Sequence, residues 1–158
     1  MDQHERDIQF LQIVKQISRM SKCSSRQVGA VLVREGSIIS QGYNGAPRGC
    51  TLCQDREQPC RRRVLGYGSG EGLELCPAQH AEGNAIIQAA RNGVATSGAT
   101  LYAWCCRPCQ KCAGAIVNAG VVRVVHVDLP AYDEMSGQIL REGGVQVDKV
   151  SAEECGWE

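Results

Sequence analysis

Aromatic residues are scarce in this chain, and neither sign of charge is in excess. Only 4% of the 158 residues are Phe, Trp or Tyr, which leaves few platforms on which single-stranded nucleic acid can stack. The chain has 17 Lys and Arg against 17 Asp and Glu, so it lacks the basic stripe that a broad grip on a polyanion requires. These absences argue against a nucleic acid polymer as partner, but they are compatible with one small phosphate.

The sequence also lacks a long apolar run and the pattern of a signal peptide. No stretch is long enough to span a membrane, so we expect a cytoplasmic protein without a membrane partner. Ten cysteines in such a compartment are more typical of metal ligands than of disulfides. A length of 158 residues suits a single domain, residues 1–158, which is large enough to fold without covalent staples.

Two short segments carry the strongest chemical signal. His80 and Glu82 open an Ala- and Ile-rich stretch, and Cys109 and Cys112 follow Pro108 at the start of another. Cysteines three apart share one face of a helix, and the helix N-terminus favours their thiolates. Pro108 suits that helix start because its missing N–H would have no intrahelical partner. With His80 alongside, the two cysteines would give zinc three protein ligands and leave a position for water, which is the catalytic arrangement.

His-x-Glu followed by Pro-Cys-x-x-Cys resembles the signature of the zinc-dependent cytidine and deoxycytidylate deaminase superfamily. Four further segments look like the deoxycytidylate (dCMP) deaminases in particular, and the similarity covers nearly the whole chain. These segments are Ser21–Cys23, Val28–Val31, Gly42–Pro47 and Ala113–Gly120. The resemblance implies zinc-dependent hydrolysis of a free pyrimidine nucleotide, with dCMP converted to dUMP and ammonia. It also implies a homo-oligomer, which in this family is often a hexamer.

Glu82 is the candidate proton shuttle of this reaction. The alternative is an ordinary first-turn acid that interacts favourably with the helix dipole. Hydrolytic deamination needs a deprotonated water, a proton on the ring nitrogen and a protonated leaving amine, and one carboxylate can relay these protons. The resemblance further implies that the backbone N–H of Ala81 binds the base carbonyl and that Asn44 binds the sugar hydroxyl. Asn44 could equally serve only to shape the turn before Gly45.

Periodicity and turn residues predict an α/β fold. A helix over residues 2–20 precedes strands over 28–34 and 37–43, which a turn at Glu35-Gly36 joins into a hairpin. From residue 80 onward helices and strands alternate, which favours parallel strands with helices on both faces. The elements expected there are helices at 80–91, 109–119 and 132–142 and strands at 99–104, 121–127 and 145–150. Together with the resemblance, this predicts a three-layer α/β/α cytidine-deaminase-like fold around a mixed five-stranded sheet.

Residues 44–79 form a long Gly- and Cys-rich insert without steady periodicity. Loops of this length are uncommon unless they have a function or something holds them. Several cysteines gather on or near the insert, and a structural zinc would contribute folding free energy directly. Some dCMP deaminases carry a second zinc in this region. We expect a second metal site here, at which Cys50 could replace one of the expected ligands. The alternative is that the cysteines are only small buried hydrophobic residues. The expected ligands are Cys23, Cys53, Cys60 and Cys76.

Cys105 and Cys106 allow other interpretations of the metal centre. The run from Cys106 through Cys109 to Cys112 is spaced like the start of a bacterial ferredoxin motif, but position 116, where a fourth cysteine would fall, is Ile. The run that starts at Cys105 matches the iron–sulfur spacing of radical enzymes that use S-adenosylmethionine, which need a larger barrel. Cys106 could also close the zinc site as a fourth ligand and make it structural.

The same segment departs from the family pattern. Tyr102 lies one residue farther from Cys109 than is usual, and Trp104–Arg107 replaces a threonine-containing stretch. Trp104 would either cover the base or simply pack. The alternatives that stay open are a modified pyrimidine nucleotide, a free nucleoside, a tRNA adenosine, and a zinc-binding module without catalysis. Three residues are candidate ligands of a 5′-phosphate, namely Arg26, Arg48 and Tyr132.

Overall fold

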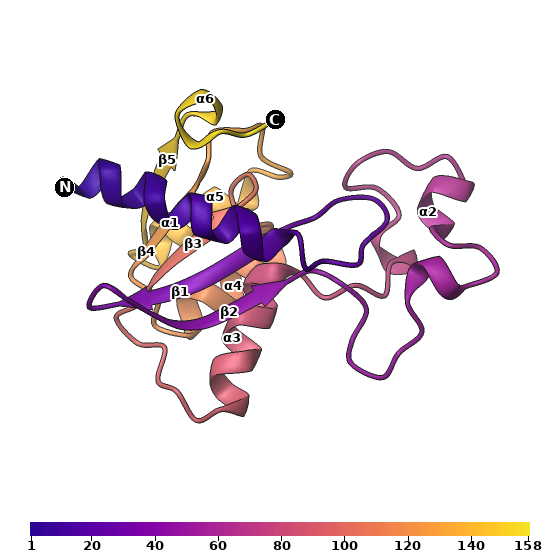
Figure 1. Ribbon diagram of the computed structural model, residues 1–158, viewed down its shortest axis with the longest axis horizontal. Helices are drawn as coiled ribbons and strands as arrows, with labels where there is room; N and C mark the ends of the chain where they lie inside the picture. Colours follow the sequence, from indigo (N-terminus) through magenta and orange to yellow (C-terminus); the bar gives the residue numbers. More distant parts are fainter.

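A computed structural model describes all 158 residues and is built on one five-stranded mixed sheet (Figure 1). The strand order is β2-β1-β3-β4-β5. The strands are β1 (Gly29–Arg34), β2 (Ser37–Tyr43), β3 (Thr100–Trp104), β4 (Arg123–Val127) and β5 (Gln146–Val150). β1 pairs antiparallel with both β2 and β3, whereas β3, β4 and β5 run parallel. The predicted hairpin, with φ of 51° and 76° at Glu35 and Gly36, and the predicted parallel half are both confirmed.

Helices cover both faces of this sheet, which confirms the three-layer α/β/α prediction. One face carries α1 (Gln3–Ser18) and the short α6 (Ala152–Cys155), and the other carries α3 (Ala81–Arg91), α4 (Gln110–Asn118) and α5 (Met135–Glu142). The sequence does not predict α6, because four residues are too few to show a helical period. None of the helices has the length and apolar character needed to cross a bilayer.

The core lies in two layers because alternate residues of each strand face opposite sides of the sheet. In β1, Ala30 and Leu32 face the layer of α3 and α4, whereas Val31 and Val33 face α1. All four residues are buried. Many alanines line the first of these layers, and small side chains let α3 and α4 lie close to the sheet and to each other.

A close approach between β2 and α3 holds the start of α3 in place. A Cβ added at Gly42 would lie 2.4 Å from the Ala81 carbonyl oxygen and from the Ala85 amide nitrogen, so a larger residue does not fit without movement. The Ser40 hydroxyl also donates to the Ala85 carbonyl at 2.6 Å. The first turn of α3, directly after His80, is thereby held against the edge of the sheet.

The insert of residues 44–79 projects away from the three layers and returns at the start of α3 (Figure 1). It holds only short elements, which are the 3-10 helices η1 (Cys53–Asp55) and η2 (Leu73–Leu75) and the four-residue α2 (Arg61–Val64). A single bridge between Gly45 and Gln79 closes its base. No residue from 45 to 79 is buried, so the insert has no apolar core of its own.

A buried ion-pair network ties α1 to the parallel half of the sheet. The Asp7 carboxylate accepts from the Arg123 guanidinium at 2.6 and 2.9 Å and from the Tyr102 hydroxyl at 2.7 Å. Burial by itself would raise the pKa of Asp7, but the bonds from Arg123, Tyr102 and Gln3 outweigh it and lower this pKa. Arg123 also donates to Asp148 of β5 at 2.7 Å.

We predict that Asp7→Asn lowers the free energy of unfolding at pH 7 by about 1.5–3 kcal/mol, because the Arg123 guanidinium loses its buried carboxylate partner and keeps only Asp148. Since the pKa of Asp7 is lowered in the folded state, its stabilisation is complete above the unfolded value near 3.8 and is lost as pH falls through the folded pKa. Urea unfolding at a series of pH values should show the two proteins converging below about pH 4. Equal stability at pH 7 would contradict this prediction.

Candidate active site

Two helix starts meet at the candidate site. His80 is the N-cap residue of α3, Cys109 is the N-cap residue of α4, and Cys112 lies in the first turn of α4. Neither N-cap side chain makes a capping hydrogen bond with its own helix. The imidazole and the two thiols instead lie against each other, because α3 and α4 are neighbours on the same face of the sheet.

The three ligand atoms have the spacing that a zinc ion requires. His80 Nδ1 lies 3.3 Å from Cys109 Sγ and 3.6 Å from Cys112 Sγ. Zinc bonds of about 2.0 Å to nitrogen and about 2.3 Å to sulfur, in tetrahedral geometry, place these atoms about 3.5 Å apart. This is the one group of three or more His, Cys, Asp or Glu side chains whose ligand atoms all lie within 4.8 Å of one another. One imidazole and two thiols are also a donor set that suits zinc, so the residues fit this metal.

The contacts within this His/Cys/Cys group favour one thiolate. The hydrogen bond from Cys112, together with that from His80, lowers the pKa of the Cys109 thiol to about 4. The bond to Cys109 raises the pKa of His80, because imidazolium and thiolate stabilise each other. The bond to Cys109, and then burial, raise the pKa of the Cys112 thiol. A bound divalent cation deprotonates a coordinating thiol outright, so zinc would displace the thiol protons of this group.

Glu82 is the second residue of α3 and faces the same centre. Its side chain is buried, and its Oε2 lies 3.9 Å from Cys112 Sγ. Burial raises the pKa of this carboxyl above its ordinary value. A carboxyl with a raised pKa is better suited to take up and release protons near neutral pH. Glu82 lies beside the ligand group without belonging to it, which leaves its oxygens free to handle protons.

Cys105 and Cys106 are buried in the loop between β3 and α4. Their sulfur atoms are 3.8 Å apart, and Cys105 Sγ lies 3.9 Å from the Tyr132 hydroxyl. Neither cysteine belongs to the group formed around His80. This placement argues against a zinc site closed by Cys106 and against a cluster that draws on either cysteine.

Trp104, the last residue of β3, points to the other side of the sheet. Its ring centroid is 5.1 Å from that of Trp157, and the Lys15 ammonium lies 5.5 Å from the Trp104 ring centroid. Trp104 belongs to the core layer beneath α1, whereas the metal ligands lie in the layer of α3 and α4. Trp104 is therefore a packing residue, and its indole lies away from the site.

Asn44 and Ala81 are the two predicted substrate contacts. The Asn44 side chain donates to the Arg26 carbonyl and accepts from the Val28 N–H, each at 2.8 Å. It therefore shapes the backbone before β1, while its second amide hydrogen is available to a ligand. The Ala81 N–H is the first amide of α3 and has no acceptor within its own helix. The substrate roles of both residues stay predictions.

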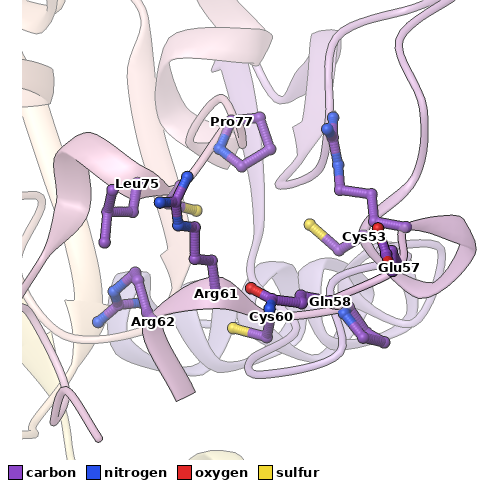
Figure 2. Close-up of a pocket in the computed structure, with 11 residues that line it drawn as sticks. Cys53, Glu57, Gln58, Cys60, Arg61, Arg62, Leu75 and Pro77 are labelled. Atoms are coloured by element: carbon purple, nitrogen blue, oxygen red, sulfur yellow. The ribbon is translucent and has the colours of Figure 1, made fainter. Parts of the chain in front are cut away.

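Three of the four cysteines predicted to hold a second metal line one open cavity in the insert, of about 500 Å³ (Figure 2). They are Cys53, Cys60 and Cys76. Three arginines line the same cavity, namely Arg56, Arg61 and Arg62. Burial, and then the nearby charges of Cys76 and Cys23, raise the pKa of the Cys53 thiol. Cys23 is thus a neighbour of these cysteines, although it comes from the segment before β1.

Local hydrogen bonds hold the Cys23 side chain in the segment before β1. Its sulfur accepts from the backbone N–H groups of Ser25 at 3.4 Å and Arg26 at 3.5 Å. Cys50 is exposed and does not line the cavity. No three of the predicted second-site sulfur atoms fall within 4.8 Å of one another. The structure brings these cysteines into one region but does not place them at metal-ligand distances.

Two residues that were not among the predicted site residues make hydrogen bonds that hold the loop carrying Cys109. Asp133 accepts from the Gln110 N–H at 3.0 Å, and Arg107 donates to the Asp133 carbonyl at 2.7 Å. An acid just before a helix is a common capping signal, and Asp133 does precede α5. Its reach to α4 depends on tertiary structure, so sequence patterns do not reveal it.

A His/Cys/Cys centre beside a buried glutamate, on a three-layer α/β/α fold, is the arrangement of the zinc-dependent deaminases. The family model for the cytidine and deoxycytidylate deaminase zinc-binding region matches residues 4–128. The chain belongs to this family.

Relatives with this domain include deoxycytidylate deaminases of fungi and phages. The enzyme of Schizosaccharomyces pombe is 36% identical over 141 residues, which are 89% of this chain and 42% of the relative. The enzyme of Saccharomyces cerevisiae is 36% identical over 145 residues, which are 92% of this chain and 45% of the relative. The enzyme of phage T4 is 34% identical over 170 aligned residues, covering 87% of this chain and 86% of the relative. The chain thus spans less than half the length of the yeast proteins and most of the phage protein.

Solved structures agree with the fold. The dCMP deaminase of cyanophage S-TIM5, crystallised in complex with dCMP and dUMP, has a TM-score of 0.76 at 28% identity and covers 95% of this chain and 99% of its own. A Thermotoga maritima diaminohydroxyphosphoribosylaminopyrimidine deaminase/reductase has a TM-score of 0.62 at 23% identity and covers 94% of this chain and 37% of its own. The second match speaks for the fold alone.

We predict that Cys109→Ser lowers the zinc content by about one ion per chain, whereas Cys106→Ser leaves it unchanged, because only Cys109 lies in the ligand group. Inductively coupled plasma mass spectrometry on each purified protein measures this content. An equal loss of zinc in the two variants would make Cys106 a ligand and contradict the prediction.

Proposed function

We propose that this chain is a zinc-dependent deaminase that hydrolyses a free pyrimidine nucleotide, dCMP, to dUMP and ammonia. The observation that carries the proposal is the His/Cys/Cys group at zinc-ligand spacing with buried Glu82 directly beside it. Similarity to deoxycytidylate deaminases along most of the chain supports dCMP as the substrate.

The residues around the centre suit each step of this hydrolysis. His80, Cys109 and Cys112 would hold zinc, which when bound supplies Lewis-acid activation of the attacking water. Glu82 would take a proton from that water and pass protons to the ring nitrogen and the leaving amine. The bond between C4 and the amine then breaks, a carbonyl forms at C4 and ammonia leaves. The Ala81 N–H would donate to the base carbonyl.

The sugar and phosphate contacts are proposed from position. Asn44 would bind the sugar hydroxyl with its unused amide hydrogen. Arg26 donates to the Tyr132 hydroxyl, and its guanidinium lies 5.4 Å from the Tyr132 ring centroid. Tyr132 is also a neighbour of Cys105, in the loop that leads to the metal ligands. We therefore prefer Arg26 and Tyr132 as phosphate ligands over Arg48, whose guanidinium is bonded to a glutamine side chain of α3 at 2.7 Å.

A modified pyrimidine nucleotide is the second candidate substrate. The observation that favours it is the buried pair Cys105 and Cys106, which stands where the family has a threonine-containing stretch and contacts Tyr132. A free nucleoside lacks the phosphate that Arg26 would bind. A zinc-binding module without catalysis would have no need of a buried carboxylate beside the ligand group.

We infer that a structural zinc stabilises the insert. Its ligands would be four cysteines, namely Cys23, Cys53, Cys60 and Cys76. Support comes from the lack of buried residues between 45 and 79, because a segment without an apolar core needs another source of folding free energy. Four thiolates around one zinc carry a net charge of about −2. The three arginines on the same cavity wall would offset that charge.

We also propose that the chain forms a homo-oligomer, with a hexamer as the form that the family suggests. β2 lies at the edge of the sheet, where its outer backbone groups have no partner strand. Ile38 and Tyr43 of β2 are exposed, and so is Ile87 of the adjacent helix α3. Apolar groups beside an open strand edge favour burial against another chain. The cytoplasmic location stays a prediction.

We predict that Glu82→Gln keeps its zinc and lowers kcat by about 10²–10⁴-fold, because glutamine preserves shape and hydrogen bonding but cannot relay protons. Ammonia release from dCMP measures the reaction, and metal analysis checks the zinc. A panel of deoxycytidine, dCMP and 5-methyl-dCMP separates the candidate substrates. Wild-type turnover in the variant would remove Glu82 from this role.

We predict about two zinc ions per chain in the wild type. Cys60→Ser should lose one ion and lower the melting temperature, whereas Cys50→Ser, the matched control in the same insert, should change neither. A count of one ion, with all four predicted cysteines open to alkylation in the folded protein, would rule out the second site.

A further inference from the structure

The helix that carries the cysteine ligands is not capped by its own N-cap side chain. The N-cap residue of α4 is Cys109, whose side chain lies in the ligand group and makes no capping bond. A Ser, Thr, Asp or Asn at this position normally accepts from one of the unpaired N–H groups of the first turn. The demand for a cysteine at 109 therefore removes the usual stabilisation from the turn that must place both sulfur atoms.

Asp133, from the segment before α5, supplies an acceptor to this first turn from outside the helix. One carboxylate oxygen accepts from the Gln110 N–H, the first amide of α4, at 3.0 Å. The other accepts from the Ser136 N–H, in the first turn of α5, at 2.6 Å. The N-cap residue of α5, Glu134, likewise makes no side-chain capping bond. One carboxylate thus caps two helices, with a negative charge where both helix dipoles favour it.

Arg107 fastens the same two segments on the other side of Cys109. Its guanidinium donates to the Asp133 carbonyl at 2.7 Å and to the buried Ser136 hydroxyl at 3.0 Å. A Cβ added at Gly137 would lie 2.9 Å from this guanidinium, so the glycine leaves it room. The backbone on each side of Cys109 is therefore tied to the start of α5.

We propose that Asp133, assisted by Arg107, is a positioning residue for the metal centre. Asp133 does not touch the ligand atoms; it fixes the first turn of α4 and thereby the relative placement of Cys109 and Cys112. The inference rests on the proposed metal role of the His/Cys/Cys group. Removing an outer partner that orients a metal ligand commonly costs about 10–100-fold in metal affinity.

The test follows zinc release from the purified protein into an excess of a chromogenic chelator. Asp133→Ala should release the active-site zinc at least about tenfold faster than the wild type. Asp133→Asn keeps one acceptor oxygen but turns a donor towards the other amide, so its rate should lie between the two. If the wild type releases zinc in more than one kinetic phase, the phase that belongs to the active site is the one that Cys109→Ser lacks.

Asp2→Ala is the matched control, because the Asp2 carboxylate caps α1 on the opposite face of the sheet through a 2.8 Å bond from the Glu5 N–H. It should lower the melting temperature, as Asp133→Ala does, and leave zinc release unchanged. Wild-type release from Asp133→Ala, or equal acceleration by Asp2→Ala, would overturn the inference.

If Asp133→Ala does not fold, Asp133→Asn and Arg107→Lys carry the test: each should release zinc faster than both the wild type and Asp2→Ala, and release at the wild-type rate from both would overturn the inference. The two proposals fail in different ways. A wild type without zinc at the His/Cys/Cys group would overturn the proposed function, and the positioning role with it. Zinc that is bound by the wild type and released equally by all variants would overturn only the positioning role.

Discussion

The contact between the His80 imidazole and the two thiols of α4 is the constraint on which the rest of the structure depends. Distances of 3.3 and 3.6 Å between these side chains require the starts of α3 and α4 to lie side by side on one face of the sheet. The small residues beneath the two helices and the close approach at Gly42 make this possible. Glu82 then lies beside the same centre without further support, because it is in the first turn of α3.

The placement of the predicted metal ligands at helix starts has a structural consequence. The His80 and Cys109 side chains face the ligand group and make no capping bond, so other contacts support both helix starts. The start of α3 is held by the bridge between Gly45 and Gln79, just before His80, and by the packing of its first turn on β2. The start of α4 is held by Asp133 and Arg107. The residues that form the ligand group thus differ from the residues that stabilise the helix starts.

The two groups of cysteines differ in how far the fold arranges them. Cys109 and Cys112 lie at the start of a helix packed in the core, and their geometry with His80 suits zinc. The cysteines of the insert belong to a segment in which no residue from 45 to 79 is buried, and their sulfur atoms lie farther apart. Packing can preorganise the first group, whereas in the second a metal would itself have to supply the order.

The amino-acid sequence by itself determined the alternation of helices and strands, the hairpin at Glu35-Gly36 and the spacing within each of the pairs His80/Glu82 and Cys109/Cys112. These features depend on residue type and on spacing within a single segment, and such patterns are local. That the two pairs form one centre is implied by the family signature, and tertiary structure brings them together. Only the tertiary structure decided that Trp104 packs under α1, that Cys106 stays outside the centre and that Asp133 caps α4. Each of these depends on the distance between segments far apart in the chain, which no local pattern specifies.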